Sequence, residues 1–432
     1  MRVGTLTGDR AGGEAVARSR VGGEVVRAVN GLTARWARTT RDGTVFSAPG
    51  VWPLLGFLAD GATGPARTEL SEALGVPADQ AAGAARQLLR ALAAFPGVGT
   101  AVGLWTERTL ELVPRWEAGL PAEAHGVLSA DVEADRRALD AWAAERTGGL
   151  IGRMPVSLTG ETELVLAGAL TMRTRWLRPF EEVALETAYA PWGGVERLGL
   201  WRRGAVLDRV GVADTPDGWV TELKVLGSDA LDVHLLLGEE GMAPGRVLGA
   251  GVDLLHRPRT VVPGSRLPYG EVGPGLRVVR ERSARHAPPS LDVLTAAYDV
   301  RAHHDLLARH ELFGLTTARD TGQGRFPGIS ARPLAVGAAA QSALARFGAL
   351  GFRAAAVTMF GAVGAGLPPA LRYVTTRINA AFDRPFGFLA LHRHSRLVLA
   401  AGWVTDPLPF PQYADDAQPN DEYVNDTWEN DE

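Results

Sequence analysis

Apolar and polar positions recur along this chain with two different periods, one typical of helices and one typical of strands. A period of three to four residues predicts helices over Val25 to Thr39, Trp52 to Leu58, Thr68 to Leu74, Ala81 to Leu92, Arg136 to Thr147 and Ala302 to Leu312. Alternating or continuous apolar runs predict strands over Thr44 to Ser47, Val98 to Trp105, Glu163 to Met172, Trp219 to Leu226, Leu231 to Leu237, Phe386 to Leu391 and Leu397 to Val404. The last two strands form a hairpin. Because strands and helices are interleaved without a regular βαβ rhythm or an internal repeat, we expect an α+β fold.

The stretch from Gly351 to Pro369 is apolar, but most of its side chains are too small to fill a core. In an extended chain one face collects every second residue, namely Phe352, Ala354, Ala356, Thr358, Phe360, Ala362 and Gly364. Most of this face is small enough to slip between closely packed strands, so we interpret the stretch as a segment that changes place. A helix end and a membrane span are the alternatives, and the glycines and the paired prolines disfavour both.

Charge is distributed unevenly along the 432 residues. The net charge of −4 includes eight acidic and no basic residues between positions 411 and 432, so the rest of the chain carries about +4. No long basic cluster and no mixing of basic with aromatic residues is present, which argues against nucleic-acid binding. All the cationic side chains except Lys224 are arginine, which we attribute to a high-GC genome.

Cysteine is absent, which excludes disulfides, thiolate metal sites and cysteine nucleophiles. The residues from Met1 to Glu24 mix charges with glycines and contain no apolar run long enough for an export signal. As written, the chain is expected in the cytoplasm. A start elsewhere in the gene, or export by another route, remains the alternative.

Motifs for catalysis and for metal binding are missing. No Gly-x-Ser-x-Gly or His-Glu-x-x-His motif occurs, and the single Lys224 lies in no phosphate-binding loop. Three histidines, His303, His304 and His310, fall on the helix predicted from Ala302 to Leu312, and His392 and His394 share a strand face. Solvated histidines are commoner than metal ligands in such settings. We therefore expect no enzyme activity, no cofactor and no metal. A hydrolase is the functional hypothesis with least support, because the sequence contains no nucleophile motif.

Several motifs occur in an order that resembles the serpin family. Phe46-Ser47 with Pro49 resembles the family's entry from a buried strand into a helix, and Leu164 to Trp176 with Pro179-Phe180 resembles its central strand. Phe313-Gly314-Leu315-Thr316 and Phe326-Pro327-Gly328-Ile329-Ser330 are similar to two further family motifs. The matches at the end of the chain are Gly351 to Thr358, Phe382 to Phe386 and Gly402 to Pro407. The resemblance, which we take to be to a bacterial-type member of the family, covers about residues 25 to 407.

The resemblance implies a fold with three β-sheets, about eight to nine helices and an exposed reactive-centre loop. It also implies suicide inhibition of a serine protease: the protease cuts the loop and is trapped when the cut loop enters the main sheet as a new strand. The hinge would comprise Gly351, Phe352, Arg353, Ala354, Ala355, Ala356, Val357 and Thr358. The reactive bond would join Ala365 to Gly366, and Arg372 is the runner-up because the residues from Ala370 to Ala381 lengthen the loop.

The expected partner is an elastase-like or subtilisin-like serine protease, since Ala365 suits a small primary pocket, whereas Arg372 would suit a trypsin-like one. The protein is expected to be a monomer that binds neither nucleic acid nor membrane. The predicted division of the chain is a flexible extension at 1–24, a serpin domain at 25–407 with a reactive-centre loop at about 349–381, and an acidic disordered tail at 408–432.

The chain departs from the family at two places that matter for the mechanism. In the hinge, Ala349 stands where Glu is usual, Phe352 where Thr or Ser is usual, and Arg353 where an acid is usual. Phe352 would point inward on insertion, at a cost on the order of 1–3 kcal/mol. The predicted sheet-opening region comprises Ser47, Gly168, Trp176 and Gln341. In this region Gly168 stands where Asn is usual and Gln341 where His is usual. The neighbouring Gly50 stands where Ser is usual. These departures favour the alternative hypothesis, a non-inhibitory serpin that acts as a binding or scaffold protein.

Overall fold

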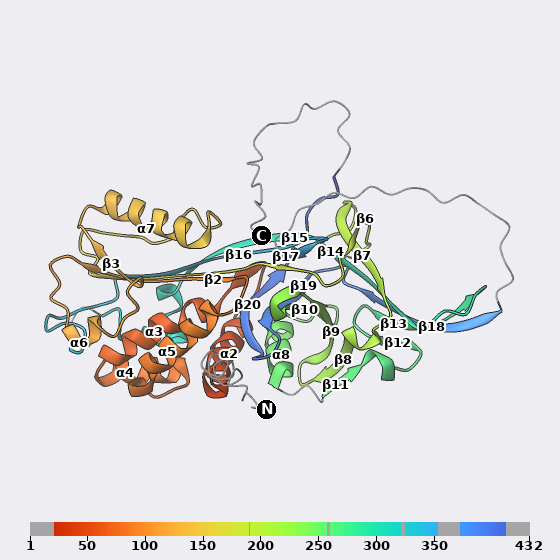
Figure 1. The fold of residues 1–432 in the computed structure, drawn as a ribbon, viewed down its shortest axis with the longest axis horizontal. Coiled ribbons are helices and arrows are strands. Elements are labelled where there is room, and N and C mark those ends of the chain that lie inside the picture. The colour runs from red at the N-terminus through yellow and green to blue at the C-terminus, as the bar shows by residue number, and fades with distance from the viewer. Residues whose placement is uncertain (1–20, 190, 257–259, 321–324, 353–371, 412–432) are drawn as a thin grey trace, which may run out of the picture.

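A computed structural model describes residues 21–189, 191–256, 260–320, 325–352 and 372–411. Within these residues the chain forms three β-sheets and eight α-helices, so the predicted α+β class with three sheets is confirmed. Figure 1 shows one long sheet that spans much of the molecule, with helices gathered at one end and the other two sheets at the opposite end.

The long sheet, called the main sheet below, has the strand order β3-β2-β4-β16-β17-β5, and β15 pairs with the free edge of β16. Its strands are β2 (Val98–Glu107), β3 (His125–Leu128), β4 (Leu164–Met172), β5 (Thr174–Arg175), β15 (Tyr298–Asp305), β16 (Ala338–Phe347) and β17 (Gly351–Phe352). The near-continuous apolar sequence of β4 predicted a strand covered on both faces, and every residue of β4 except Thr171 is buried.

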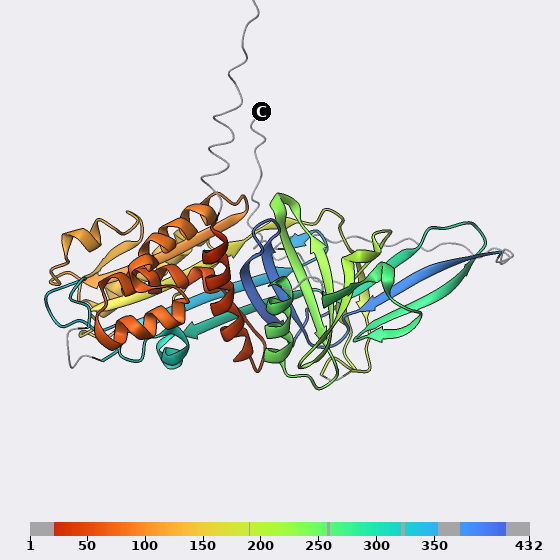
Figure 2. The same ribbon diagram turned by 90° about the horizontal axis from the view of Figure 1, so that it is seen from below.

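The other two sheets pack behind one end of the main sheet (Figure 2). The inner sheet has the order β1 (Thr44–Phe46), β20 (Leu397–Val404), β19 (Phe386–His392), β10 (Leu231–Gly238), β9 (Gly218–Leu226), β8 (Val210–Thr215) and β11 (Val261–Pro263). The end sheet has the order β12 (Gly270–Gly273), β13 (Leu276–Ser283), β18 (Tyr373–Ala381), β14 (Ser290–Ala296), β7 (Arg197–Gly204) and β6 (Glu181–Leu185).

Helices cover both faces of the main sheet. The helices are α2 (Gly23–Arg38), α3 (Trp52–Gly61), α4 (Gly64–Leu74), α5 (Ala78–Ala93), α6 (Pro114–Glu117), α7 (Val132–Thr147), α8 (Pro244–His256) and α9 (His310–Phe313). In Figure 1 the helices α2 to α5 lie on one face and α7 lies alone on the other. Helix α7 begins where the carboxylate of Asp131 accepts the N–H groups of Glu133 and Ala134, and it ends at Gly148 with a left-handed φ of 59°.

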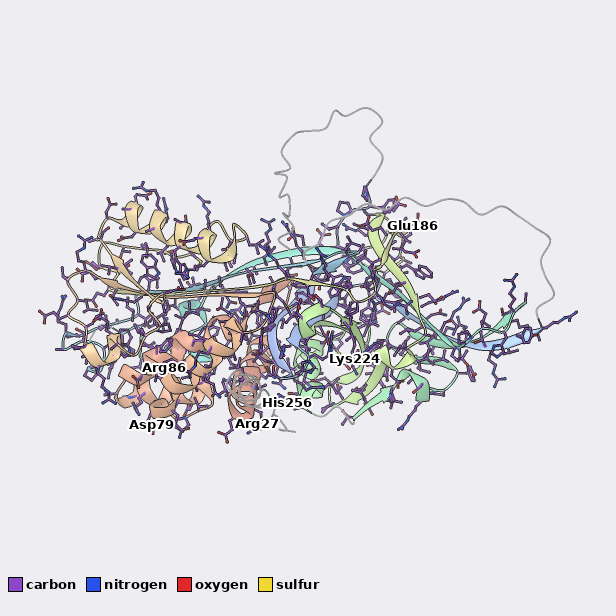
Figure 3. The ribbon with its side chains drawn as sticks, viewed as in Figure 1. Arg27, Asp79, Arg86, Glu186, Lys224 and His256 are labelled. Carbon is purple, nitrogen blue, oxygen red and sulfur yellow. The ribbon has the colours of Figure 1, made fainter. Side chains whose placement is uncertain are left out.

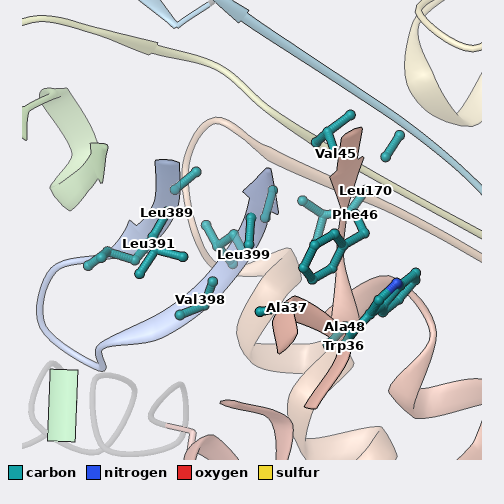
Figure 4. Close-up of a cluster of buried hydrophobic side chains, with 14 of the residues drawn as sticks. Trp36, Ala37, Val45, Phe46, Ala48, Leu170, Leu389, Leu391, Val398 and Leu399 are labelled. Atoms are coloured by element: carbon teal, nitrogen blue, oxygen red, sulfur yellow. The ribbon is translucent and has the colours of Figure 1, made fainter. Parts of the chain in front are cut away.

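The main core lies between α2, the inner sheet and the main sheet. Figure 4 shows Trp36 and Phe46 at its centre, with Leu170 of β4 and Leu399 of β20 nearby. The rings of Trp36 and Phe46 stack with their centroids 4.7 Å apart, and both side chains are fully buried. The predicted elements from Val25 to Leu92 all meet in this core, so the patterns of buried residues that defined them are confirmed.

Two regions were predicted wrongly. Of the range predicted as one helix from Ala302 to Leu312, the first four residues up to Asp305 belong to strand β15, because β15 pairs along its whole length with β16. Leu307–Arg309 form a 3-10 helix, and only His310–Phe313 is α-helical. Helix α8 was missed, since glycines interrupt its apolar period. Those glycines allow close packing: a Cβ on Gly251 would lie 2.1 Å from Leu236 Cδ1, and one on Gly245 would lie 2.5 Å from the carbonyl oxygen of Arg38.

The ends of the predicted loop and tail also differ from the structure. Residues Tyr373–Ala381, assigned to the reactive-centre loop, form β18 and pair with both β13 and β14. Leu408 and Phe410, assigned to the tail, are hydrogen-bonded to the folded body, where Leu408 donates to the carbonyl of Ala297 (2.8 Å). The predicted extension at 1–24 and the acidic residues from position 412 onward lie largely outside the described residues, so these parts of the division stay predictions.

No helix in the described part of the chain combines the length and the apolar character that crossing a bilayer requires. The uncharged stretch from Ala354 to Leu371, for which a span was weighed, lies outside the described residues.

A buried ion pair in the inner sheet leads to a prediction about acid stability. The carboxylate of Glu222 lies 2.7 Å from Nδ1 of His234 and 3.5 Å from Nζ of Lys224. Burial alone raises the pKa of Glu222, but the charge and hydrogen bond of His234, with help from Lys224, outweigh it and lower the pKa from 4.5 to about 2. The ionised form therefore stabilises the fold above pH 4.5, and this contribution is lost as the pH falls towards 2.

We expect Glu222→Gln to remove a contribution on the order of 2–3 kcal/mol at neutral pH and to flatten the loss of stability between about pH 4.5 and 2. Urea unfolding of both proteins across this pH range measures the difference. Parallel pH profiles for the two proteins would contradict the assignment.

Candidate functional site

The two central strands of the main sheet, β4 and β16, run parallel but pair over only part of their length. Direct pairs join Ala338 to Val165 and continue to Ser342 with Ala169, which makes five residue pairs. Beyond them, β4 pairs only with β2, whereas β16 pairs with β15 and, at Phe347 alone, with β17. We call the boundary between β4 and β16 the seam.

The middle of the seam is open on both sides. Within the described residues, Leu170 to Arg173 on the β4 side and Ala343 to Arg346 on the β16 side have no strand partner across it. Backbone donors and acceptors that face a gap in a sheet form a template for another strand. Four residues on each side are therefore available to pair with an added strand.

The top of the seam is already filled by β17, the first two residues of the predicted hinge. Phe352 lies opposite Phe347 of β16 and Thr174 of β5, and both pairings are antiparallel. Gly351 fits because a Cβ there would lie 2.3 Å from the carbonyl oxygen of Thr174. β17 thus runs antiparallel to both neighbours, which is the direction that a strand added to the seam would take.

The prediction for Phe352 needs correction. Its side chain was expected to turn inward only on insertion, but in this intact chain it is already buried, with 3% of its surface exposed. Its ring centroid lies 6.4 Å from that of Phe388. The reason is that side chains alternate between the two faces of a strand, and the pairing of β17 with β5 places Phe352 on the face towards the core. Burial of the ring is therefore not a cost of any later step.

Trp176 and Phe180 hold the chain that leads into β17. The indole Nε1 of Trp176 donates to the carbonyl of Gly348 (2.9 Å), and its backbone N–H donates to the carbonyl of Leu350 (2.9 Å). The N–H of Phe180 donates to the carbonyl of Ala349 (2.8 Å). These three bonds fix the turn between β16 and β17, and Trp176 was selected from the sequence without this role being foreseen.

A second cluster lies at the closed end of the seam. The side-chain amide of Gln341 accepts the N–H of Ser47 (2.8 Å) and donates to the carbonyl of the same residue (2.6 Å). The hydroxyl of Ser47 in turn accepts the N–H of Gly50 (3.2 Å). A Cβ on Gly168 would lie 2.3 Å from the carbonyl oxygen of Gly50, so a glycine is required there.

Of the four residues predicted to form the sheet-opening region, the structure brings three together. Ser47, Gly168 and Gln341 meet at the closed end, whereas Trp176 lies at the other end of the seam. The two groups therefore act at different ends of the seam. The cluster at the closed end links β16 to Ser47, and Trp176 holds the start of the predicted hinge.

The sequence analysis named His304 as a histidine on a helix but missed its role next to Gln341, which it faces in the β15–β16 pairing. Its Nε2 lies 2.8 Å from the carbonyl oxygen of Val45 and so donates to it, and burial lowers the pKa of His304. The wrong helix prediction hid this residue, since only a strand places it towards the core. Its neighbour His303 instead contacts the hydroxyl of Ser342 (Nδ1 to Oγ, 2.9 Å). No group of three or more possible metal ligands occurs among the described residues.

The remaining predicted site residues from Arg353 to Thr358, together with Ala365 and Gly366, lie outside the described residues. Arg372 is described: it is exposed and directly precedes β18 of the end sheet. The described chain thus leaves the main sheet at Phe352 and re-enters the structure at the end sheet.

Comparisons with known proteins agree with this architecture. The family model described as serpin (serine protease inhibitor) matches residues 29–189. The rice protein named "Putative serpin-Z6C" (Oryza sativa subsp. japonica) is 27% identical over 423 residues, which covers 88% of this chain and 97% of the rice protein.

Two solved structures are similar over most of the chain. The structure of human thyroxine-binding globulin complexed with thyroxine has a TM-score of 0.66 at 18% identity and covers 89% of this chain and 98% of that one. Native protease nexin-1 with heparin has a TM-score of 0.64 at 16% identity and covers 91% of this chain and 100% of that one.

The chain therefore has the serpin fold, and its sequence is similar to the serpin (serine protease inhibitor) family model over residues 29–189. The resemblance found in its motifs is confirmed. The further expectation of a bacterial-type member has no support, because the sequence relatives found are rice proteins.

The cluster at the closed end of the seam leads to a stability prediction. Gln341→Ala removes two hydrogen bonds and leaves the buried N–H and carbonyl of Ser47 without their partner, so we expect a loss of about 1–3 kcal/mol. Urea unfolding measures it. Gln80→Ala, at an exposed position of α5, is the matched control and should change stability by less than about 0.5 kcal/mol. Equal effects of the two changes would show that the bonds contribute nothing.

Proposed function

We propose that this protein inhibits a serine protease by suicide cleavage, and that the cut loop inserts into the open seam between β4 and β16. The observation that carries the proposal is the seam itself, with four unpaired residues on each side and β17 seated at its top. The protein then acts as an inhibitor of proteases, with no enzyme activity of its own.

The register of β17 specifies where each following residue would lie. Phe352 is opposite Phe347 and Thr174, so in the same register Arg353 to Ala356 would pair with the open residues on both sides. Val357 and the four residues after it would replace the five direct pairs between β4 and β16. Insertion would therefore begin without breaking a pair and meet resistance only at the closed end.

The alternation set by Phe352 suits the sequence of the hinge. Ala354 would face inward between Met172 and Ala345, and Ala356 between Leu170 and Ala343, where only small side chains fit. Arg353 would face outward, which accounts for a charged residue at this position.

New ladder hydrogen bonds supply the free energy for insertion of the cut loop. Each inserted residue can form ladder hydrogen bonds with strands on both sides, and a net gain of about 0.5–1.5 kcal/mol per bond is typical. The first four residues gain these bonds at no cost in existing pairs. The resulting stabilisation, released after cleavage, is what would hold the acylated protease.

For the reactive bond we propose Ala365–Gly366, with an elastase-like or subtilisin-like target. Arg372 remains the alternative for a trypsin-like protease, and its exposure leaves it accessible.

The second candidate is a non-inhibitory serpin that binds a partner or ligand. It is favoured by the two bonds of Gln341 to Ser47, which hold the closed end together and would resist insertion. A structure with the same fold is described as a complex with thyroxine, so this fold also carries ligands.

The first experiment incubates the protein with elastase, subtilisin and trypsin. We expect a covalent complex that survives a denaturing gel with elastase or subtilisin, and a cut at Ala365–Gly366 by mass spectrometry. The clipped protein should melt at a higher temperature than the intact one, because the added strand completes the sheet. Clean cleavage by every protease without a complex would favour the non-inhibitory candidate.

Two neighbouring alanines offer a matched control for insertion. Ala356→Arg would place a charge in the core beneath the seam, and a barrier higher by about 1.4 kcal/mol already lowers trapping tenfold relative to hydrolysis. Ala355→Arg makes the same change on the outer face, opposite the half-exposed Thr171 and Leu344, and should leave trapping unchanged. Equal trapping by both variants would exclude insertion in this register.

The position of Phe352 makes a further prediction. Because its ring is buried before cleavage, Phe352→Thr should destabilise the intact and the clipped protein alike, by about 2–4 kcal/mol. The ratio of trapped to hydrolysed protease should not change. A clear rise in the trapped fraction would mean that the ring is an obstacle to insertion after all. Calorimetry of both forms and gel quantification of the complex provide the two readouts.

A further inference from the structure

A small cavity lies between the inner sheet and the end sheet, next to the segment that follows β5. Its volume is about 250 Å³, and its walls come from β7, β9 and β14 together with Leu177, Arg178, Val206 and Arg209 from the connecting segments. Figure 3 labels Lys224, which lines it from β9. Neither the protease mechanism nor the seam uses this cavity.

The lining of the cavity is strongly and uniformly basic. It includes Arg178, Arg202, Arg203, Arg209 and Lys224 and no acidic residue. Two of these charges are compensated from outside the lining. Arg203 forms a two-pronged pair with Asp292 (2.6 and 2.7 Å), and Lys224 lies 3.5 Å from a carboxylate oxygen of Glu222.

The other three cations, Arg178, Arg202 and Arg209, have no carboxylate within ion-pair distance in the described part of the chain. The acidic neighbour of Arg209 in sequence, Asp208, instead accepts the backbone N–H of Ser265 (2.9 Å). Three uncompensated positive charges around one small cavity repel each other.

Arg202 is held in place by two contacts. Its guanidinium lies over the ring of Phe180, 4.2 Å from the centroid, and its Nη1 donates to the backbone carbonyl of Arg178 (2.9 Å). Burial, followed by the charges of Arg178 and Arg209, lowers the pKa of Arg202 from 12.5 to about 10. A guanidinium that is held in place and lacks a counter-ion is suited to bind an anion.

The cavity also has apolar surface that a bare inorganic ion would not use. Leu177 and Val206 are exposed at its rim, by 59% and 52%, and Leu291 and Val293 are buried at the end-sheet side. A volume of 250 Å³ is at the low end for small-molecule sites, so only a compact ligand would fit.

From this combination we infer that the cavity binds a small organic anion with a tetrahedral oxyanion head group, such as the phosphate or sulfate ester of a short aryl or alkyl group. Arg178, Arg202 and Arg209 receive the head group, and Leu177 and Val206 contact the apolar part. Binding supplies the negative charge that the three arginines lack, and it does not depend on whether the protein inhibits proteases.

The test titrates the full-length protein with phenyl phosphate and phenyl sulfate at low ionic strength, by calorimetry and by thermal melting. We expect saturable binding with one ligand per chain and a rise in melting temperature. Inorganic phosphate has only the anionic head group and phenol has only the apolar ring, so each should bind at least about tenfold more weakly than the esters. Absence of saturable binding by both esters, or equal binding of inorganic phosphate, would overturn the assignment.

Charge variants locate the site. Arg209→Gln and Arg202→Gln should each weaken binding about tenfold or more, because each removes one charge-assisted hydrogen bond to the head group. Arg137 is exposed on α7 and does not line the cavity, so Arg137→Gln removes one positive charge away from the site. This variant should change the affinity by less than twofold. Since Arg202 also contacts Phe180, the Arg209 variant decides the matter if the Arg202 variant is unstable. Equal weakening by the Arg137 and Arg209 variants would show that only net charge matters.

Discussion

Incomplete pairing between β4 and β16 is the constraint on which this architecture depends. The two strands share five residue pairs at one end, and at the other end the two-residue strand β17 lies between β16 and β5, the short strand that follows β4. Between these ends, backbone groups on the two sides have no ladder partner across the seam among the described residues. The sheet is thus less than fully paired while the chain is intact, and a longer segment could complete it.

Two groups of side chains limit how far the seam is open. Trp176 and Phe180 fasten the turn before β17 by hydrogen bonds to three consecutive backbone carbonyls, which keeps the start of the hinge in place. At the other end, Gln341 ties β16 to Ser47 behind the sheet. Under the proposed function, the balance between these fixed ends and the unpaired middle would decide whether the protein acts as an inhibitor or as a stable binding protein.

Much of the fold could be predicted because its patterns are local. The apolar period of α2, the continuous run of β4 and the hairpin of β19 and β20 each encode their own element, and the motifs around Ser47, Trp176 and Phe386 pointed to the serpin fold. The strands β15 and β16 could not be found in this way. The alanine-rich sequence of β16 has a high helix propensity, and it is a strand because β4 and β15 offer ladder partners on both sides.

The amino-acid sequence alone specified the fold class, most of the elements and the residues that meet at the closed end of the seam. These features follow from side-chain periodicity and from family motifs, which are local patterns in the sequence. Long-range pairing settled the rest. It determined that Phe352 is buried before any cleavage, that Tyr373–Ala381 belongs to a sheet, and that three uncompensated arginines surround one cavity. These facts depend on which distant strands lie side by side, and a local pattern contains no information about its partner.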